Sequence, residues 1–124
     1  MTFRLSLPEE RYGERYQRVQ FGQALLDRLS ALQVVRSAGF ADSIPLVDDR
    51  QGTSLYIEGT PLPGPGEEAI VNFTLVSSGY FRAMGMQLVV GRSFDARDVT
   101  EGNPTAIIDR SLAARFFPGE DPIG

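Results

Sequence analysis

The sequence predicts an α+β fold with a mixed sheet, and three observations support this class. One long stretch, residues 9–32, repeats its apolar residues with the period of a helix, whereas several shorter segments alternate apolar and polar residues as strands do. Proline and glycine separate these segments into loops. With 124 residues, 42% of them apolar and 23% charged, the chain has the size and composition of one globular domain, so we expect a packed core.

The first part of the chain predicts a β-α-β unit. Residues 3–7 alternate as a short half-buried strand, and the helical stretch follows Pro8 with two acidic residues that suit a helix N-terminus. Residues 34–41 predict the second strand. The C-terminal half of the helix is expected to pack on a sheet through an apolar stripe. This stripe consists of Phe21, Leu25, Leu29 and Leu32, widened by Val19 and Leu26.

The second part predicts further strands and two more helices. Strands are expected at residues 55–58, 70–76, 86–90 and 105–108, with loops at 47–52, 59–68 and 91–104. Ser77 is a candidate N-cap for a short helix through Met84, and Gly85 is placed to end it in the left-handed conformation. Asp109 is expected to cap a last helix, which stops at Pro118.

The residue types that are missing exclude whole classes of chemistry. The chain contains no His, Cys, Trp or Lys, and all 12 basic residues are Arg. Zinc, copper, haem and iron–sulfur sites therefore lose their usual ligands, and no Ser–His, Cys–His or Ser–Lys nucleophile pair can form. The net charge of −4 makes nucleic acid an unsuitable partner. We expect no catalytic residue, no cofactor and no metal site.

One group of acidic residues leaves an alternative open. Asp95, Asp98 and Glu101 lie in one predicted loop and carry the oxygen ligands that Ca²⁺ prefers, but their spacing is not that of an EF-hand. We favour a solvated loop. A hydrolase that uses two carboxylates is a further hypothesis, and it requires two acids in one cleft.

The sequence contains no recognisable membrane segment. No stretch approaches the roughly 18 consecutive apolar residues of a membrane span, and the N-terminus lacks the apolar region of a secretory signal. The last four residues, 121–124, place an apolar Ile after a helix and a turn, as at the approach to a strand. We therefore expect the fold to be truncated at its C-terminus.

Three segments carry motifs in a fixed order. Residues 76–86 are similar to a V-S-x-x-Y-F-x-x-x-G motif, residues 91–98 to G-R-x-F…D, and residues 106–124 to a strand and helix that end in F-P-G-x-D-P-I-G. Together they resemble the MacB-like periplasmic core domain of ABC-transporter permeases, the family of macrolide-exporter and FtsX-like permeases. Residues 21–40 are similar to the first helix and strand of that family, although Gln33-Val34 stands where the family often has Pro-Gly.

The resemblance implies a non-catalytic domain outside the cytoplasmic membrane. It implies two lobes: residues 1–47 begin a β-α-β lobe similar to transporter porter domains, and residues 48–124 form most of a second, mixed α/β lobe. The implied partners are the remainder of a dimeric permease, a periplasmic adaptor protein and, indirectly, an ATPase subunit or domain. The implied function is to couple ATP hydrolysis to periplasmic movement and to dock an adaptor or cargo. A free-standing ligand- or peptide-binding module is the alternative.

Three aromatic residues are candidate partner contacts: Tyr80, Phe81 and Phe117. Aromatic side chains dominate binding hot spots. The competing interpretation is packing within the domain, which we favour for Tyr80 and Phe81. Phe116 lies one turn after Leu112 and is expected in the core, which leaves Phe117 for an exposed role.

Three arginines near the N-terminus, Arg11, Arg15 and Arg18, are candidate membrane-proximal contacts. A row of arginines beside a membrane attracts anionic lipid headgroups. The simpler interpretation, which we favour, is a solvated stripe in which Glu14 pairs with Arg18.

Overall fold

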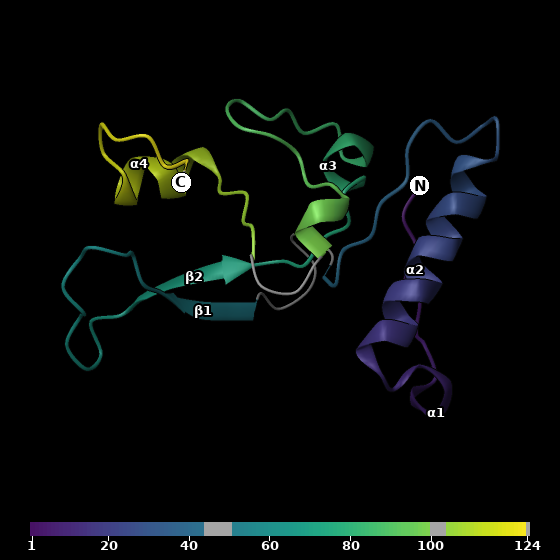
Figure 1. Cartoon of the computed structure of the whole chain (residues 1–124), viewed down its shortest axis with the longest axis horizontal. Coiled ribbons are helices and arrows are strands. Elements are labelled where there is room, and N and C mark those ends of the chain that lie inside the picture. The colour runs from purple at the N-terminus through teal and green to yellow at the C-terminus, as the bar shows by residue number, and fades with distance from the viewer. Residues whose placement is uncertain (44–50, 100–103, 124) are drawn as a thin grey trace.

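The computed structural model describes residues 1–43, 51–99 and 104–123, which form a mixed α/β fold (Figure 1). Within these ranges there are four α-helices, one 3₁₀ helix and a two-stranded sheet, so a fold that contains both helices and strands is confirmed. The expected mixed sheet is wrong for the described residues, because their two strands are antiparallel. In chain order the elements are α1 (Glu9–Tyr12), α2 (Arg15–Ser30), β1 (Gln51–Leu55), β2 (Ala69–Phe73), α3 (Tyr80–Ala83), η1 (Ala96–Val99) and α4 (Arg110–Phe116). None of the helices described has the length and apolar content needed to cross a membrane.

The helix predicted over residues 9–32 is confirmed, with one interruption. α1 ends at Tyr12, and Glu14 adopts an extended backbone with φ −82° and ψ 143° before α2 begins. Glu14 and Gln17 form a capping box, in which each side chain accepts a hydrogen bond from the backbone N–H of the other. The Tyr12 ring meets the Phe21 ring edge-on at 5.2 Å between centroids, and this contact holds the two helices together.

Four of the expected strands are wrong, because their residues are irregular in the structure: 3–7, 34–41, 86–90 and 105–108. The second of these contributes a single bridge, Ala41 with Val76. The described part of the chain therefore contains no β-α-β unit. An alternating pattern specifies which side chains face a core, but a strand also needs backbone beside it to bond with.

The sheet is the hairpin of β1 and β2. Thr53 lies opposite Val71 at its centre. β1 shares only Leu55 with the strand expected at 55–58, and residues 56–58 lie outside the sheet, because pairing with β2 sets the extent of β1. The loop expected at 47–52 falls partly outside the described residues, and its last two residues belong to β1.

The two helices expected in the second part are confirmed with one corrected cap. Gly79, not Ser77, is the N-cap of α3, and Gly85, with φ +67°, ends this helix as expected. Asp109 caps α4: its Oδ1 accepts from the Leu112 N–H at 2.8 Å.

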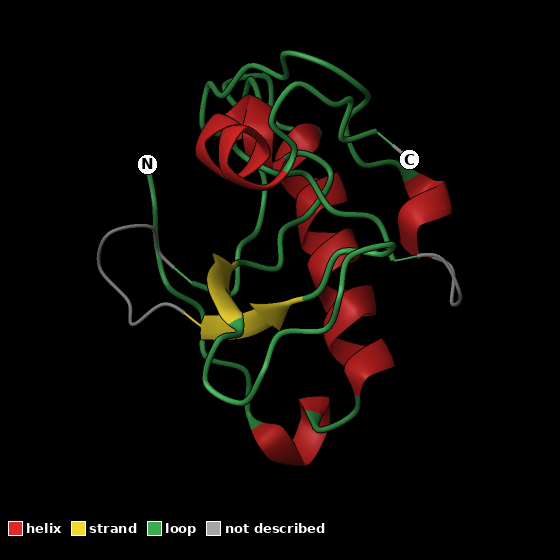
Figure 2. Cartoon of the chain, turned by 90° about the vertical axis from the view of Figure 1, so that its left-hand side faces the viewer, coloured by secondary structure: helices red, strands yellow, loops and turns green. Residues whose placement is uncertain are grey.

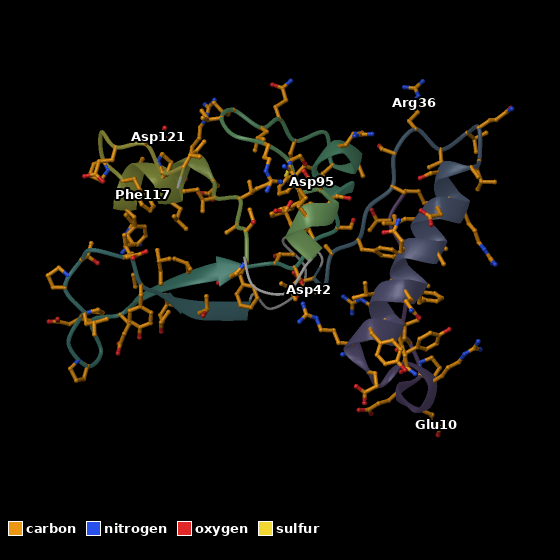
Figure 3. All side chains as sticks on the ribbon, in the orientation of Figure 1. Glu10, Arg36, Asp42, Asp95, Phe117 and Asp121 are labelled. Carbon is orange, nitrogen blue, oxygen red and sulfur yellow. The ribbon has the colours of Figure 1, made fainter. Side chains whose placement is uncertain are left out.

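A backbone clasp joins two segments that are far apart in the sequence, residues 38–43 and residues 74–80. Ala41 and Val76 form an antiparallel bridge at its centre. Asp42, labelled in Figure 3, lies in this clasp, between the hairpin and α2.

Reciprocal hydrogen bonds close the clasp. The Asp42 N–H donates to the Leu75 carbonyl oxygen, and the Ser77 N–H donates to the Phe40 carbonyl oxygen, both at 3.0 Å. In the other direction, the Phe40 N–H donates to Ser77 Oγ at 2.8 Å and the Leu75 N–H donates to Asp42 Oδ1 at 3.1 Å. Each segment therefore uses both its backbone and a side chain to bind the other.

The packed core expected from the composition is not found among residues 1–43, 51–99 and 104–123. No described residue is buried, and the chain exposes 10735 Å² of accessible surface. A folded protein of this size exposes about 6,600 Å². Among the described elements, contacts are confined to β1 with β2 and α1 with α2, so α2 does not pack on the sheet. Figure 1 shows α2 toward one end of the long axis, the hairpin and α4 toward the other end, and α3 between them; Figure 2 views the same arrangement from the end that holds the hairpin.

Two glycine-to-alanine substitutions are expected to act in opposite directions on the free energy of unfolding. A Cβ on Gly39 would lie 2.5 Å from the Tyr80 Cα, so Gly39→Ala forces the clasp apart. The expected loss of stability is about 1–3 kcal/mol. A Cβ on Gly22, within α2, would lie 3.5 Å from the Phe40 ring, which is ordinary contact. Gly22→Ala is therefore expected to add up to about 1 kcal/mol through helix propensity.

Urea unfolding followed by circular dichroism measures both substitutions, and Gly22→Ala is the control for Gly39→Ala. Equal effects of the two variants would contradict the close backbone approach at Gly39.

Candidate functional site

The first two motif segments meet in an aromatic row on and beside α3. The rings of Tyr80 and Phe81 lie 5.5 Å apart, and the ring of Phe81 lies 6.0 Å from that of Phe94. All three side chains are half-buried. The aromatic row therefore ties residues 76–86 to residues 91–98, a role within the domain.

The third motif segment also reaches the second. Gly91 has φ +83°, and a Cβ built on it would lie 3.2 Å from Ile123 Cδ1. A side chain at this position would be strained in its backbone and would press on Ile123. The glycine that opens the second motif and the isoleucine near the end of the third are therefore neighbours.

An ion-pair network holds the loop that follows Gly91. Arg92 binds Asp98 through both terminal nitrogens, at 2.7 Å each, and lies 3.3 Å from Asp95. Arg97 binds Asp95 at 2.6 Å. The Asp95 N–H also donates to Asp98 Oδ2 at 2.7 Å. Asp98 thus accepts bidentate hydrogen bonds from the Arg92 guanidinium and a further hydrogen bond from a backbone amide. Bidentate, charge-assisted hydrogen bonds are among the strongest that a carboxylate makes.

The network lowers the pKa of both carboxyls. Hydrogen bonds from the side chain and backbone of Arg97 lower the pKa of Asp95 to about 2. The pKa of Asp98 lies well below its ordinary value, chiefly because of hydrogen bonds from Arg92 and then from the Asp95 N–H. Both aspartates are therefore ionised at neutral pH, with arginine as their counter-charge.

The sequence identifies these acids but not their partners. The signal was present, because Arg92 and Arg97 alternate with Asp95 and Asp98 in one short stretch. Guanidinium groups occupy the carboxylate oxygens that the calcium interpretation required, so the described residues give that interpretation no support. Glu101 lies outside the described residues.

The structure does not bring the three aromatic candidates together. Phe117 is the C-cap residue of α4, and α4 makes no contact with α3 among the described elements. Figure 3 shows Phe117 on the opposite side of the molecule from α2, far from Asp95. Phe116 and Phe117 are both half-buried, so the expectation that Phe116 alone lies in a core is wrong.

Two of the three candidate arginines take part in the turn between α1 and α2. Arg18 donates to the Tyr12 carbonyl oxygen at 2.9 Å, and the Arg11 guanidinium lies 5.5 Å from the centre of the Tyr12 ring. The expected ion pair between Glu14 and Arg18 is not found in the described part of the chain, because Arg18 binds backbone and Glu14 caps α2. Arg15 is the first residue of α2 and is exposed.

Acid is expected to open the ion-pair network in a defined pH range. Since the folded-state pKa values of Asp95 and Asp98 lie below the ordinary value of 3.8, the network stabilises the loop above about pH 4. This stability is lost as the pH falls through about 2. Carboxyl-carbon NMR is expected to place the Asp95 midpoint near 2.

Two arginine variants test the assignment of partners in the same titration. Arg97→Gln is expected to move the midpoint of Asp95 up toward its ordinary value, and Arg92→Gln is expected to do the same for Asp98. Each variant is the control for the other. A wild-type Asp98 that titrates at the ordinary value would contradict the network.

A family of known proteins matches most of the chain. The family described as MacB-like periplasmic core domain matches residues 9–124. The macrolide export ATP-binding/permease protein MacB of Haemophilus ducreyi is 42% identical over 48 residues, which are 39% of this chain and 7% of that protein. MacB of Neisseria gonorrhoeae is 37% identical over 49 residues, 40% of this chain and 8% of that protein. MacB 2 of Aeromonas hydrophila is 31% identical over 77 residues, 56% of this chain and 12% of that protein.

The extent of the family match decides the membership of the chain. The matched residues include all three motif segments and both helices α1 and α2. No solved structure matches the chain. The chain spans between 7% and 12% of the length of these three relatives. It belongs to the MacB-like periplasmic core domain family, a periplasmic part of the ABC-transporter permeases of the inner membrane.

Proposed function

We propose that this domain is a non-catalytic, force-transmitting part of an ABC-transporter permease. It couples ATP hydrolysis in the cytoplasm to movement of periplasmic lobes, and it docks an adaptor protein or cargo. The observation that carries the proposal is the family match over residues 9–124.

The chemistry of the described side chains supports a mechanical role. The chain has no His, Cys or Lys, and the two acids whose pKa values are most strongly lowered, Asp95 and Asp98, bind arginines. A group that stays ionised and paired near neutral pH is a poor proton donor or acceptor for catalysis. The network therefore acts on the shape of a loop.

The open apolar surface supports assembly with other parts of a permease. Val34 is 89% exposed and Leu62 is 82% exposed. Extended exposed apolar surface marks sites of interaction. We assign covering contacts to the remainder of the permease, and we propose that the parts of Tyr80, Phe81 and Phe117 that stay accessible beside their contacts within the domain contribute to them.

The proposed domain division follows the family. Residues 1–47 begin one lobe and residues 48–124 form most of the other. The names of the relatives join macrolide export, ATP binding and permease activity, so by likeness this domain serves efflux together with an ATPase domain or subunit. The permease is a dimer in this proposal, and Arg11, Arg15 and Arg18 lie near anionic lipid headgroups.

Movement of the two lobes is directly measurable. The chain has no cysteine of its own, so Val34→Cys and Leu62→Cys introduce one spin label on each lobe. In the intact permease, reconstituted in lipid nanodiscs with its ATPase and freed of other cysteines, the distance between the labels is expected to change between the nucleotide-free and vanadate-trapped states. Pulsed electron–electron double resonance measures the distance between the two spin labels.

A pair of labels within one lobe provides the control. Leu62→Cys with Leu75→Cys places both labels in residues 48–124, and this distance is expected to stay constant. A distance between positions 34 and 62 that is the same in both nucleotide states would contradict the proposed coupling.

A further inference from the structure

The clasp lies where the two proposed lobes meet. Residues 38–43 belong to the first lobe and residues 74–80 to the second, and the described hydrogen bonds between the lobes cluster here. A hydrogen bond between the hydroxyls of Ser43 and Thr74, at 3.2 Å, closes the end of the clasp nearest the hairpin. Motion of one lobe against the other therefore acts on these residues first.

Phe40 and Ser77 connect α2 to α3 through the clasp. A Cβ on Gly22 of α2 would be in ordinary contact with the Phe40 ring, so α2 lies directly against this residue. Phe40 exchanges two hydrogen bonds with Ser77, and the Ser77 carbonyl oxygen accepts from the N–H of Tyr80, the first residue of α3, at 3.0 Å. A displacement of α2 thus reaches α3 through a short chain of direct contacts.

Two glycines let the backbones of the clasp touch. A Cβ on Gly39 would lie 2.5 Å from the Tyr80 Cα, and one on Gly79 would collide with the Ala38 carbonyl oxygen. These distances leave no room for a side chain between the two segments at either position. The two backbones are therefore in direct contact, and the hydrogen bonds of the clasp oppose their separation.

The clasp is also short, which permits rotation. Ala41 and Val76 form a single bridge, whereas β1 and β2 pair over five residues. Neighbouring strands tolerate twists of about 10–35°. A long ladder multiplies the restraint on twist, but one bridge with flanking bonds holds two segments together and leaves the angle between them adjustable.

We propose that the clasp is the pivot of this domain: its bonds stay closed while the two lobes turn about it. The pivot rests on the proposed function, since it specifies where the movement of the lobes is centred. Positions far from the clasp, such as 34 and 62, move relative to each other, and the two sides of the clasp do not separate.

A disulfide across the bridge tests whether the clasp stays closed. Ala41 and Val76 lie directly opposite each other in an antiparallel pair, a Cα separation that suits a disulfide. The two substitutions Ala41→Cys and Val76→Cys are introduced into the intact permease. The spin labels at positions 34 and 62 are attached to non-natural amino acids that carry a ketone, so that the two cysteine thiols remain free to form the disulfide. The change in distance between nucleotide states is expected to be the same in the oxidised and reduced protein. The control pair, Thr53→Cys with Val71→Cys, locks the hairpin.

Removal of the side-chain acceptors tests whether the clasp is needed. Ser77→Ala with Asp42→Ala removes the partners of the Phe40 and Leu75 N–H groups. The change in distance is expected to fall by at least half while ATP hydrolysis continues, and the oxidised 41–76 disulfide is expected to restore it. Asp42→Asn keeps an acceptor oxygen and is expected to keep the movement. If the alanine variant does not fold alone, it is folded with the disulfide closed and then reduced in the nanodisc.

The outcomes separate the pivot from the proposed function. A wild-type permease without any change in distance contradicts the proposed function. The pivot is overturned, and the proposed function is not, if the distance between the labels changes in the wild-type permease but the 41–76 disulfide abolishes this change and the 53–71 disulfide does not. Full movement in the double alanine variant after reduction also overturns the pivot.

Discussion

The clasp between residues 38–43 and residues 74–80 determines where the other elements lie. It brings the segment that follows α2 beside the start of α3, and it closes the chain into a loop from which the hairpin of β1 and β2 extends. No described residue is buried, so the segments are held together by backbone and side-chain hydrogen bonds, whereas in most domains a packed core holds them together. The glycines at 39 and 79 make this possible, because a larger residue at either position would keep the segments apart.

Local signals in the sequence predicted the helices, and non-local pairing decided the strands. The capping residue Asp109 and the terminating Gly85 act within one turn, so their roles could be identified from neighbouring residues. Residues 86–90 have the composition of a strand, yet nothing in that segment specifies a partner, and the structure provides none among the described residues. Ser77 shows the same limit: it has the chemistry of an N-cap, but its hydroxyl binds the backbone of Phe40, a residue distant in sequence.

The candidate site divides in the same way. The motif residues Phe81, Arg92 and Asp98 could be identified in the sequence. In the structure they make contacts within the domain: Phe81 in the aromatic row, and Arg92 with Asp98 in the ion-pair network. Their spacing did not show that Arg92 would bind Asp98 with both nitrogens, since that depends on the turn made by η1. The proposed function requires such contacts within the domain, because a load applied at α2 is transmitted only as far as the contacts between segments allow. Under the proposed function, the exposed apolar side chains are the ones that contact the remainder of the permease.

Amide hydrogen exchange tests most directly whether the clasp holds the domain together. The backbone N–H groups of Phe40, Asp42, Leu75 and Ser77 all donate within the clasp. In the intact permease these four amides are expected to exchange as slowly as those in the middle of α2, and to do so in every nucleotide state. Exchange at the rate of exposed loop amides, or a clasp that loses protection when ATP is bound, would contradict this account.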